Sequence, residues 1–374
     1  MRSLGIQSRL CLFSCALTTT IMKSVVSTVL LSAMAVSAAP GLVLDVAGPS
    51  SVVDVNSLTV KATLKNTGDV ALKLLNDPRT VLSKARTNTF SISSASGTPK
   101  FTGLYAKYVP SKAAADAKES TFTVLAPGQS IEVEHNLAGV YNFTQSGEGA
   151  YSFDAGNLFN YVDESGQLKT IEASSNSHQF KLAGKLAAPN GHASAISRRA
   201  VSYTGCTSTQ QSQISTAATS SNTYVSNVNS YLARISSGTT RYTTWFGTFS
   251  TSRYNTIVSH YKNIGTDATS TNYDCTACKS EPGIDYSSTF AYVNAGSPGK
   301  IYLCGAFWSA PNTGTDSRAG TIVHENSHFT VNGGTQDYVY GQSSAKSLAK
   351  SNPAQAILNA DNHEYFAENN PSLS

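Results

Sequence analysis

The sequence predicts two folded parts of different class: an all-β, sandwich-like domain over residues 39–183, and a helix-dominated α+β domain with a small antiparallel sheet over residues 200–374. A chain of 374 residues is long enough for two domains of ordinary size. Upstream, apolar residues alternate with polar ones at the period of half-buried strands, whereas downstream they recur at helical spacing. A Gly/Pro/Ala/Ser-rich stretch without periodicity, residues 184–199, separates the two patterns and predicts a linker.

Residues 1–38 are predicted to form a secretory signal. Lys23 precedes an apolar run, residues 24–38, that ends in small residues, which is typical of a signal cleaved during export. The run is too short and too rich in serine for a membrane span, and a buried core helix is the alternative interpretation. Met22 followed by Lys23 would itself make a good signal start, so Met22 is a candidate for the true start. We therefore expect a secreted, extracellular protein whose mature form has no membrane segment.

Two stretches carry the strand period of the upstream half. In SLTVKATLKN (57–66) every second residue is apolar, and the turn TGD follows directly. In APGQSIEVEHNL (126–137) a Pro-Gly turn precedes the same alternation. Short strands separated by turns indicate a sandwich or barrel. This half also contains an N-glycosylation sequon at Asn142.

The predicted linker ends in Arg198 and Arg199, which together form a candidate site for a dibasic processing protease. Two solvated surface arginines are the other interpretation. Residues 200–374 hold nine Lys/Arg against ten Asp/Glu, so the excess behind the formal charge of +4 lies upstream. No stripe of Lys or Arg forms, which argues against a nucleic-acid partner.

Helical spacing dominates the downstream half, with one pair of strands. The expected elements are two helices around 224–235 and 254–261, a hairpin of TFAYVN (289–294) and KIYLCGAFW (300–308), a helix Ser317–Asn332 ended by Gly333-Gly334, and a short helix that opens at Asn352-Pro353.

The six cysteines divide between the leader and the downstream half. Cys11 and Cys15 fall in or before the predicted signal. The remaining even number in an oxidising compartment predicts two disulfides. A zinc knuckle or redox pair in the CxxC stretch is the alternative. These four residues are Cys206, Cys275, Cys278 and Cys304.

The stretch HENSH places His324 and His328 four residues apart around Glu325. On a helix, residues four apart lie on one face, so both imidazoles can reach one metal ion while the glutamate stands beside it. This HExxH spacing predicts two zinc ligands and a general base. A third protein ligand is needed, and Asp337, which follows the glycine turn, is the preferred candidate over His363.

The stretch GTIVHENSHFTVNGGTQDYVYGQ (320–342) resembles the active-site segment of the deuterolysin family, the aspzincins. Within that family it is most similar to the fungal peptidyl-Lys metalloendopeptidases. RYTTWFG (241–247), YLCGAFW (302–308) and NADNHEYFAENNP (359–371) extend the similarity over residues 202–374. The upstream half resembles the family's pro-region only in general character.

The resemblance implies a zincin fold and one Zn²⁺ per chain, bound by His324, His328 and Asp337. It further implies Glu325 as the catalytic base and acid, and Tyr340 as a hydrogen-bond donor to the oxyanion. In the family's lysine-specific members an acidic pair receives the substrate lysine, and the matching positions are Asp361 and Glu364. Without the resemblance these two would be interpreted as ordinary solvated charges.

The resemblance also implies the disulfides Cys206–Cys275 and Cys278–Cys304. This chain spaces the two middle cysteines as CxxC, where the family pattern is expected to be CxC. The upstream half is implied to be a propeptide, acting as an intramolecular inhibitor or folding chaperone.

The predicted function is a secreted zinc endopeptidase, made as a zymogen. It would hydrolyse peptide bonds on the N-terminal side of lysine (Lys at P1′) with a zinc-activated water and Glu325 as base. Protein or peptide substrates and the chain's own propeptide are the expected partners, and the enzyme is expected to be a monomer. One alternative is a broader deuterolysin acting on basic proteins. Another is a secreted binding protein with an inactive zincin remnant.

Overall fold

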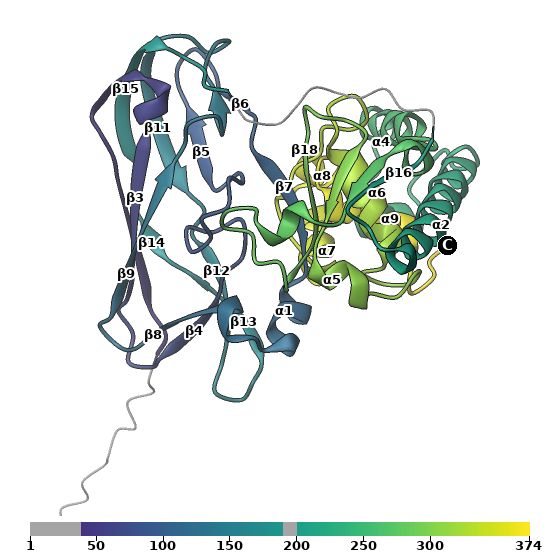
Figure 1. Cartoon of the computed structure of the whole chain (residues 1–374), viewed down its shortest axis with the longest axis horizontal. Coiled ribbons are helices and arrows are strands. Elements are labelled where there is room, and N and C mark those ends of the chain that lie inside the picture. The colour runs from purple at the N-terminus through teal and green to yellow at the C-terminus, as the bar shows by residue number, and fades with distance from the viewer. Residues whose placement is uncertain (1–38, 190–199) are drawn as a thin grey trace, which may run out of the picture. The chain divides into compact units, whose positions relative to one another are not determined.

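Strands dominate the N-terminal half and helices the C-terminal half of the computed structural model, which describes residues 39–189 and 200–374 (Figure 1). The predicted signal, residues 1–38, and the predicted processing site, Arg198-Arg199, lie outside the described residues. Within the described ranges, no helix is both long enough and apolar enough to cross a membrane.

The described part of the N-terminal half contains three four-stranded sheets and one two-stranded sheet. The first sheet has the order β14 (Ser174–Ser175), β1 (Leu42–Ala47), β3 (Thr59–Asn66), β9 (Ser130–Asn136). The second has the order β2 (Ser51–Asp54), β15 (His178–Lys185), β11 (Gly149–Ala155), β5 (Phe90–Ser93). The third has the order β13 (Leu168–Glu172), β12 (Leu158–Val162), β4 (Leu72–Leu75), β8 (Phe122–Leu125), and the small one pairs β10 (Tyr141–Asn142) with β6 (Lys100–Phe101).

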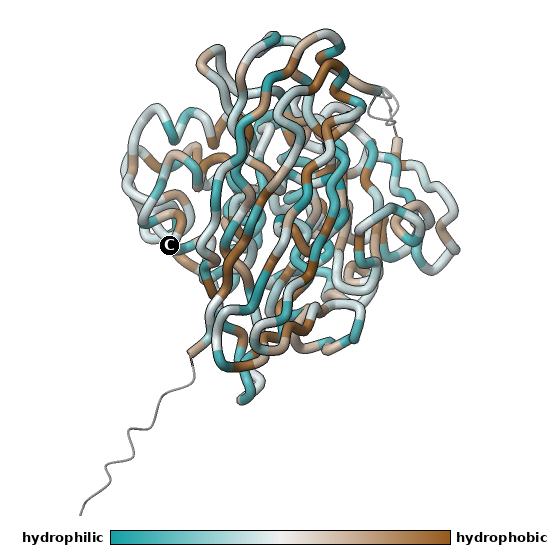
Figure 2. The backbone as a smooth tube through the Cα atoms, turned by 90° about the vertical axis from the view of Figure 1, so that its left-hand side faces the viewer, coloured by the Kyte–Doolittle hydropathy of each residue, from teal (hydrophilic) through white to brown (hydrophobic). Residues whose placement is uncertain are grey.

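The alternation found in the sequence corresponds to buried and exposed faces of these strands. In β3 the apolar residues Val60, Ala62 and Leu64 are buried, while Lys61 and Lys65 face solvent. Figure 2 shows the same change of hydropathy along neighbouring strands. One apolar cluster is shared by strands of all three larger sheets, so their inner faces form a common core. Asn142 is partly exposed at the end of β10.

Two elements of the N-terminal half depart from a purely β domain. Helix α1 (Pro110–Asp116) begins with proline in its first turn, where the missing N–H costs no hydrogen bond. Strand β7 (Leu104–Tyr108) directly precedes this helix and pairs with a strand of the C-terminal half instead of its own sheets.

The C-terminal half packs helices around a five-stranded sheet of order β16–β17–β19–β18–β7. Its own strands are β16 (Ser202–Thr204), β17 (Asn272–Asp274), β18 (Thr289–Asn294) and β19 (Lys300–Leu303). The helices are α2 (Ser208–Leu232), α3 (Thr240–Phe246), α4 (Thr251–Ile264), α5 (Gly305–Ser309), α6 (Arg318–His328), α7 (Gln342–Ser351), α8 (Pro353–Ala356) and α9 (Ala360–Glu368).

The predicted antiparallel sheet is wrong in part, because β16, β17 and β19 run parallel to one another. Only the pairs of β18 with β19 and with β7 are antiparallel. Parallel neighbours need a long crossover, which α2, α3 and α4 provide between β16 and β17. Strands of three residues contain too few positions for an alternating pattern, so the sequence did not reveal them.

Two predicted boundaries also change. The strand expected over 300–308 ends at Leu303, and Gly305–Ser309 forms the short helix α5, because a short apolar run fits either state. The helix expected to reach Asn332 ends at His328. The Phe329 carbonyl there accepts the N–H groups of residues 332, 333 and 334 in a tight turn.

The structure joins Cys206 to Cys275 and Cys278 to Cys304, with Cα–Cα distances of 5.1 and 5.5 Å. The two cysteines of the CxxC stretch therefore belong to different bridges. The first bridge ties the start of α2 to the end of β17, and the second ties the following loop to the end of β19.

His363, the alternative metal ligand, packs against another histidine. Its Nδ1 lies 3.0 Å from the Asn359 carbonyl and must donate to it, so the Nε2 of neutral His363 is an acceptor. His260 Nδ1 lies 3.0 Å from that Nε2 and supplies the proton. Burial lowers the pKa of His260 to about 4 and, together with His260, that of His363 to about 3. Both imidazoles are therefore neutral in the folded protein near neutral pH.

This histidine pair predicts a loss of stability in mild acid. Both pKa values are lowered by folding, so the stabilisation is complete above pH ~6.5, the unfolded value, and is lost as the pH falls below it. For His260 alone the loss by pH 5 is about 2 kcal/mol. His260→Gln should therefore lose less free energy of unfolding between pH 7 and pH 5 than the parent chain. Denaturant titrations with a chelator present measure this difference, because metal release then makes no contribution.

His178→Gln, which changes a partly exposed histidine of β15, is the matched control and should behave like the parent. An equal loss in the parent chain and in His260→Gln would contradict the assignment of a neutral buried pair.

Candidate metal centre and lysine pocket

Helix α6 presents the HENSH motif from a fully buried position. Its N-terminus is capped by Ser317, whose hydroxyl accepts the N–H of Gly320 at 2.9 Å. Glu368 of α9 accepts from the Ser317 N–H at 2.9 Å and from its hydroxyl at 2.7 Å. The two helices that carry the site residues are thereby fixed to each other at this end.

The chain turns back after α6 and brings Asp337 to the helix. Gly334 adopts a positive φ of 57°, and a Cβ at Gly333 would lie 2.9 Å from the Ser327 carbonyl. Both positions therefore favour glycine. Gln336 donates its N–H to the Leu358 carbonyl at 2.7 Å, which fixes the loop immediately before Asp337.

His324, His328 and Asp337 converge on one point, as the sequence spacing predicted. Asp337 Oδ1 lies 3.2 Å from His324 Nε2 and 3.4 Å from His328 Nε2. These three atoms are buried and have no hydrogen-bond partner in the described part of the chain. His328 Nδ1 donates to the Thr335 carbonyl at 2.9 Å, so the Nε2 of neutral His328 offers a lone pair to the same point.

The electrostatics of this trio favour a cation. Burial would lower the pKa of His324, but the carboxylates of Asp337, Asp361 and Glu364 raise it well above its ordinary value. Burial likewise raises the pKa of Asp337, but His328 and His324 outweigh it and hold that pKa below its usual range. Two imidazole nitrogens and one carboxylate oxygen around a buried point are a ligand set that fits Zn²⁺.

Glu325 lies beside this trio with one carboxylate oxygen free of protein partners. Burial is the main cause that raises its pKa to about 8, and the neighbouring Asp337 adds to the effect. Its Oε1 accepts the backbone N–H of Lys107 at 3.1 Å, whereas its buried Oε2 has no protein partner among the described residues. A carboxylate that gains and loses a proton near neutral pH suits a general base and acid.

Tyr340 points its hydroxyl at a backbone carbonyl. It donates to the Ala106 oxygen at 2.5 Å. The Arg79 guanidinium lies 4.2 Å from the centre of the Tyr340 ring. A phenol that donates to a carbonyl in this buried position is placed to stabilise negative charge on that oxygen.

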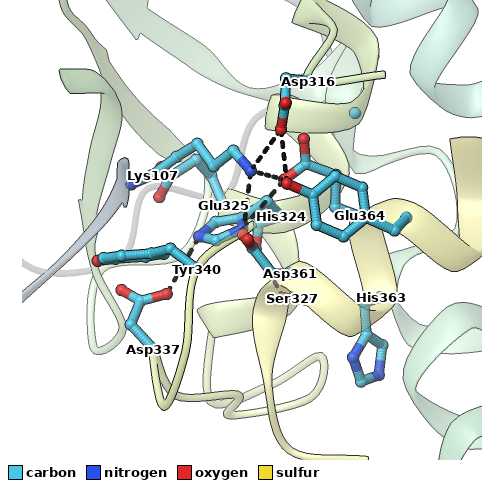
Figure 3. A network of polar contacts seen from close by, with 12 residues as sticks. Lys107, Asp316, His324, Glu325, Ser327, Asp337, Tyr340, Asp361, His363 and Glu364 are labelled. Atoms are coloured by element: carbon cyan, nitrogen blue, oxygen red, sulfur yellow. Dashed lines mark hydrogen bonds and ion pairs between the residues drawn. The ribbon is translucent and has the colours of Figure 1, made fainter. Parts of the chain in front are cut away.

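The acidic pair on α9 encloses a lysine ammonium (Figure 3). Asp361 and Glu364 lie on one face of the helix and are fully buried. Lys107 Nζ lies 3.0 Å from Asp361 Oδ1, 2.7 Å from Glu364 Oε2 and 3.4 Å from Asp316 Oδ1. Burial would lower the pKa of Lys107, but these carboxylates raise it well above its ordinary value. The side chain, itself 0% exposed, is a charged lysine inside an anionic pocket.

Two members of this pocket escaped the sequence interpretation. Lys107 lies in LYAKY, a strand-like stretch in which one lysine carries no signal of its own. Asp316 precedes α6 with a positive φ of 51° and accepts the Tyr365 hydroxyl at 2.6 Å. Asp316 lies close to the HENSH motif in sequence, which could have drawn attention to it. No feature of the sequence indicated that its side chain faces α9.

A second set of possible ligands is His324, Asp361 and Glu364. His324 Nδ1 lies 2.9 Å from Asp361 Oδ1 and 3.2 Å from Glu364 Oε2. In this structure the two carboxylates face the Lys107 ammonium. We therefore assign this set to the pocket that holds the lysine and orients the His324 ring. His363 points away from both sets (Figure 3).

A helix with HExxH spacing, a carboxylate returning after a glycine turn and a glutamate beside the trio define a metallopeptidase site. A family model of lysine-specific metallo-endopeptidases, the aspzincins, matches residues 231–368. The chain is 50% identical over 345 residues to a peptidyl-Lys metalloendopeptidase of Grifola frondosa, covering 91% of this chain and 97% of the relative. It is 49% identical over 347 residues to one of Armillaria mellea, covering 92% and 96%.

A solved zinc peptidase of Grifola frondosa aligns with 52% identity and a TM-score of 0.43, covering 45% of this chain and 100% of the other. On the extent and identity of the sequence matches, the chain belongs to the aspzincin family of metalloendopeptidases.

The proposed ligand set predicts a specific loss of metal. Asp337→Ala and His328→Ala should each weaken zinc binding by more than ~100-fold, because removing a contact that merely orients a ligand already costs 10–100-fold. Zinc content after dialysis against a buffer of fixed free zinc measures this. His363→Asn serves as the control and should retain about one zinc per chain. Loss of zinc from His363→Asn, together with retention of zinc by Asp337→Ala, would refute the assignment of Asp337 as the third ligand.

Proposed function

We propose that the chain is a secreted zinc endopeptidase that cleaves on the N-terminal side of lysine and is made as a zymogen. One observation carries the specificity: the carboxylates of Asp361 and Glu364 are fully buried and enclose a lysine ammonium at 3.0 and 2.7 Å. A buried carboxylate pair without a cation is costly, so a substrate with a neutral side chain at this position binds poorly. The names of the two relatives support the same specificity.

The catalytic step follows from the positions of Glu325 and Tyr340. A zinc ion held by His324, His328 and Asp337 would supply Lewis acidity, which polarises a carbonyl and makes a water molecule more acidic. Tyr340 donates a hydrogen bond to the carbonyl oxygen as negative charge develops on it. Glu325 takes the proton of the attacking water and passes it to the leaving nitrogen; its Oε1 already accepts one peptide N–H, that of Lys107, at 3.1 Å.

The zymogen part of the proposal rests on where the N-terminal half contacts the site. β7 of that half covers Glu325 and Tyr340 and fills the pocket with Lys107. We infer that residues 39–183 act as a propeptide that inhibits the enzyme and assists its folding, and that the linker 184–199 is cut after Arg199. The predicted leader and the two disulfides support export to an oxidising compartment. We take the mature enzyme to be a monomer.

Peptide mapping tests the specificity. The chain, cut after Arg199 and loaded with zinc, should digest a test protein rich in both lysine and arginine to peptides that begin with lysine. Mass spectrometry of the new N-termini reads this directly. Equal cleavage before arginine would favour a peptidase of broader specificity for basic proteins, and the absence of any cleavage would point to a non-catalytic binding protein.

The pocket predicts different kinetic effects for two of its carboxylates. Asp361 contacts both the ammonium and His324, so Asp361→Asn should lower kcat and kcat/KM together, the latter by more than ~100-fold. Asp316 contacts the ammonium from a partly exposed position and does not contact the imidazole. Asp316→Asn should therefore raise KM for a lysyl peptide by ~3–10-fold with kcat nearly unchanged. A fall in kcat alone for Asp316→Asn would contradict its place in the pocket.

A further inference from the structure

A strand of the N-terminal half completes the sheet of the C-terminal half. β7 pairs antiparallel with β18, with Ala106 opposite Tyr292 and Lys107 opposite Ala291. Among the described strands β18 has β19 on its other side, so without β7 it would be the sheet edge. An exposed edge is the template onto which an extended peptide adds as a further strand. β7 therefore lies where an extended peptide substrate can add.

The peptide bond between Ala106 and Lys107 lies among the proposed catalytic groups. The Ala106 carbonyl accepts from the Tyr340 hydroxyl at 2.5 Å. The Lys107 N–H donates to Glu325 Oε1 at 3.1 Å, and the Ala106 N–H donates to Asp337 Oδ2 at 3.0 Å. The carbonyl that would be attacked and the nitrogen that would leave therefore each face the residue proposed to act on them.

The side chains on either side of this bond are also placed by the site. The Tyr105 ring stacks on the His328 imidazole at a centroid distance of 4.4 Å, and its hydroxyl donates to Gln336 Oε1 at 2.7 Å. Lys107, directly after the bond, fills the anionic pocket. Along β7 the bond that would be cleaved comes first and the lysine follows it directly. A substrate of an enzyme that cleaves on the N-terminal side of lysine has the same order.

The strand is held at its upstream end, and a cavity lies beside the loop that carries Asp337 and Tyr340. Leu104 donates its N–H to the Arg86 carbonyl at 2.8 Å, and Asn294 Nδ2 donates to the Thr102 carbonyl at 2.8 Å. A cavity of about 640 Å³ is lined in part by Asp337 and Tyr340. This cavity is large enough to hold water beside Asp337 and Tyr340.

We propose that β7 is an internal substrate and that Ala106–Lys107 is a cleavage site in the enzyme's own chain. The inference rests on the proposed function. One water is consumed: its oxygen bonds to the Ala106 carbonyl carbon, and the C–N bond to Lys107 breaks. The Lys107 nitrogen accepts a proton and leaves as an amine, and the other product is a carboxylate on Ala106. The observations that carry the proposal are the contacts of the bond itself: Tyr340 donates to the Ala106 carbonyl and Glu325 accepts the Lys107 N–H.

Zinc-triggered self-processing of the full chain tests the proposal. The chain is purified with a chelator, loaded with zinc, and followed by intact mass and N-terminal mapping. A new N-terminus at Lys107 should form with a first-order rate that does not depend on protein concentration, because the bond is bound within the same molecule. Glu325→Ala should give no product. Lys107→Ala should slow cleavage of this bond by at least tenfold.

Lys112→Ala is the matched control, because this partly exposed lysine of α1 pairs with Asp116 outside the site and its loss should leave the rate unchanged. A zinc-loaded parent chain that keeps the Ala106–Lys107 bond intact overturns the proposal. An external lysyl peptide separates this failure from a failure of the proposed function. If the chain cut after Arg199 cleaves the peptide while the Ala106–Lys107 bond of the parent stays intact, only the self-cleavage is wrong. If the chain cut after Arg199 cleaves neither the peptide nor this bond, both are wrong.

Discussion

The imidazole of His324 is shared between two charged sites, and the arrangement of the whole centre depends on it. Its Nε2 faces Asp337 at 3.2 Å, while its Nδ1 faces Asp361 at 2.9 Å. The first face belongs to the proposed metal site and the second to the lysine pocket. A carboxylate that accepts from one imidazole nitrogen makes the other nitrogen a better ligand. Asp361, which contacts the Lys107 ammonium, therefore also faces the imidazole of a proposed metal ligand, so the pocket and the proposed metal site are coupled through one ring.

Several fold features serve to hold this ring between its neighbours. α6 supplies the imidazole, and α9 packs against it with Asp361, Glu364 and Glu368 along one face. Glu368 caps the start of α6. The turn at Gly333 and Gly334 returns Asp337 to the helix it has just left. Where α9 brings Asp361 and Glu364 together, the Lys107 ammonium between them offsets their repulsion.

The sequence was informative where a local pattern fixes the geometry. HExxH spacing on a helix determines that His324 and His328 share a face, and a glycine turn limits how far Asp337 can lie from them. The amphipathic helices follow from a period of about 3.6 residues, and the alternation in β3 follows from a period of about two. By contrast, three-residue parallel strands carry no pattern. Lys107 meets Asp316, Asp361 and Glu364 only through contacts 209 to 257 residues away along the chain. Asp361 and Glu364 were identified only through the family resemblance. Periodicity alone would describe them as two acidic residues near the end of the chain.

The N-terminal half supplies a positive charge to the acidic pocket of the C-terminal half. Without a cation in the pocket, folding would bury Asp361 and Glu364 side by side, and the desolvation of two like charges is strongly unfavourable. The Lys107 ammonium removes that penalty in the full chain. If this lysine were to leave, the same penalty would favour binding of the lysine of another peptide. On this reasoning, the proposed folding assistance, inhibition and substrate preference have one physical origin: a buried pair of carboxylates that is stable only with an ammonium group between them.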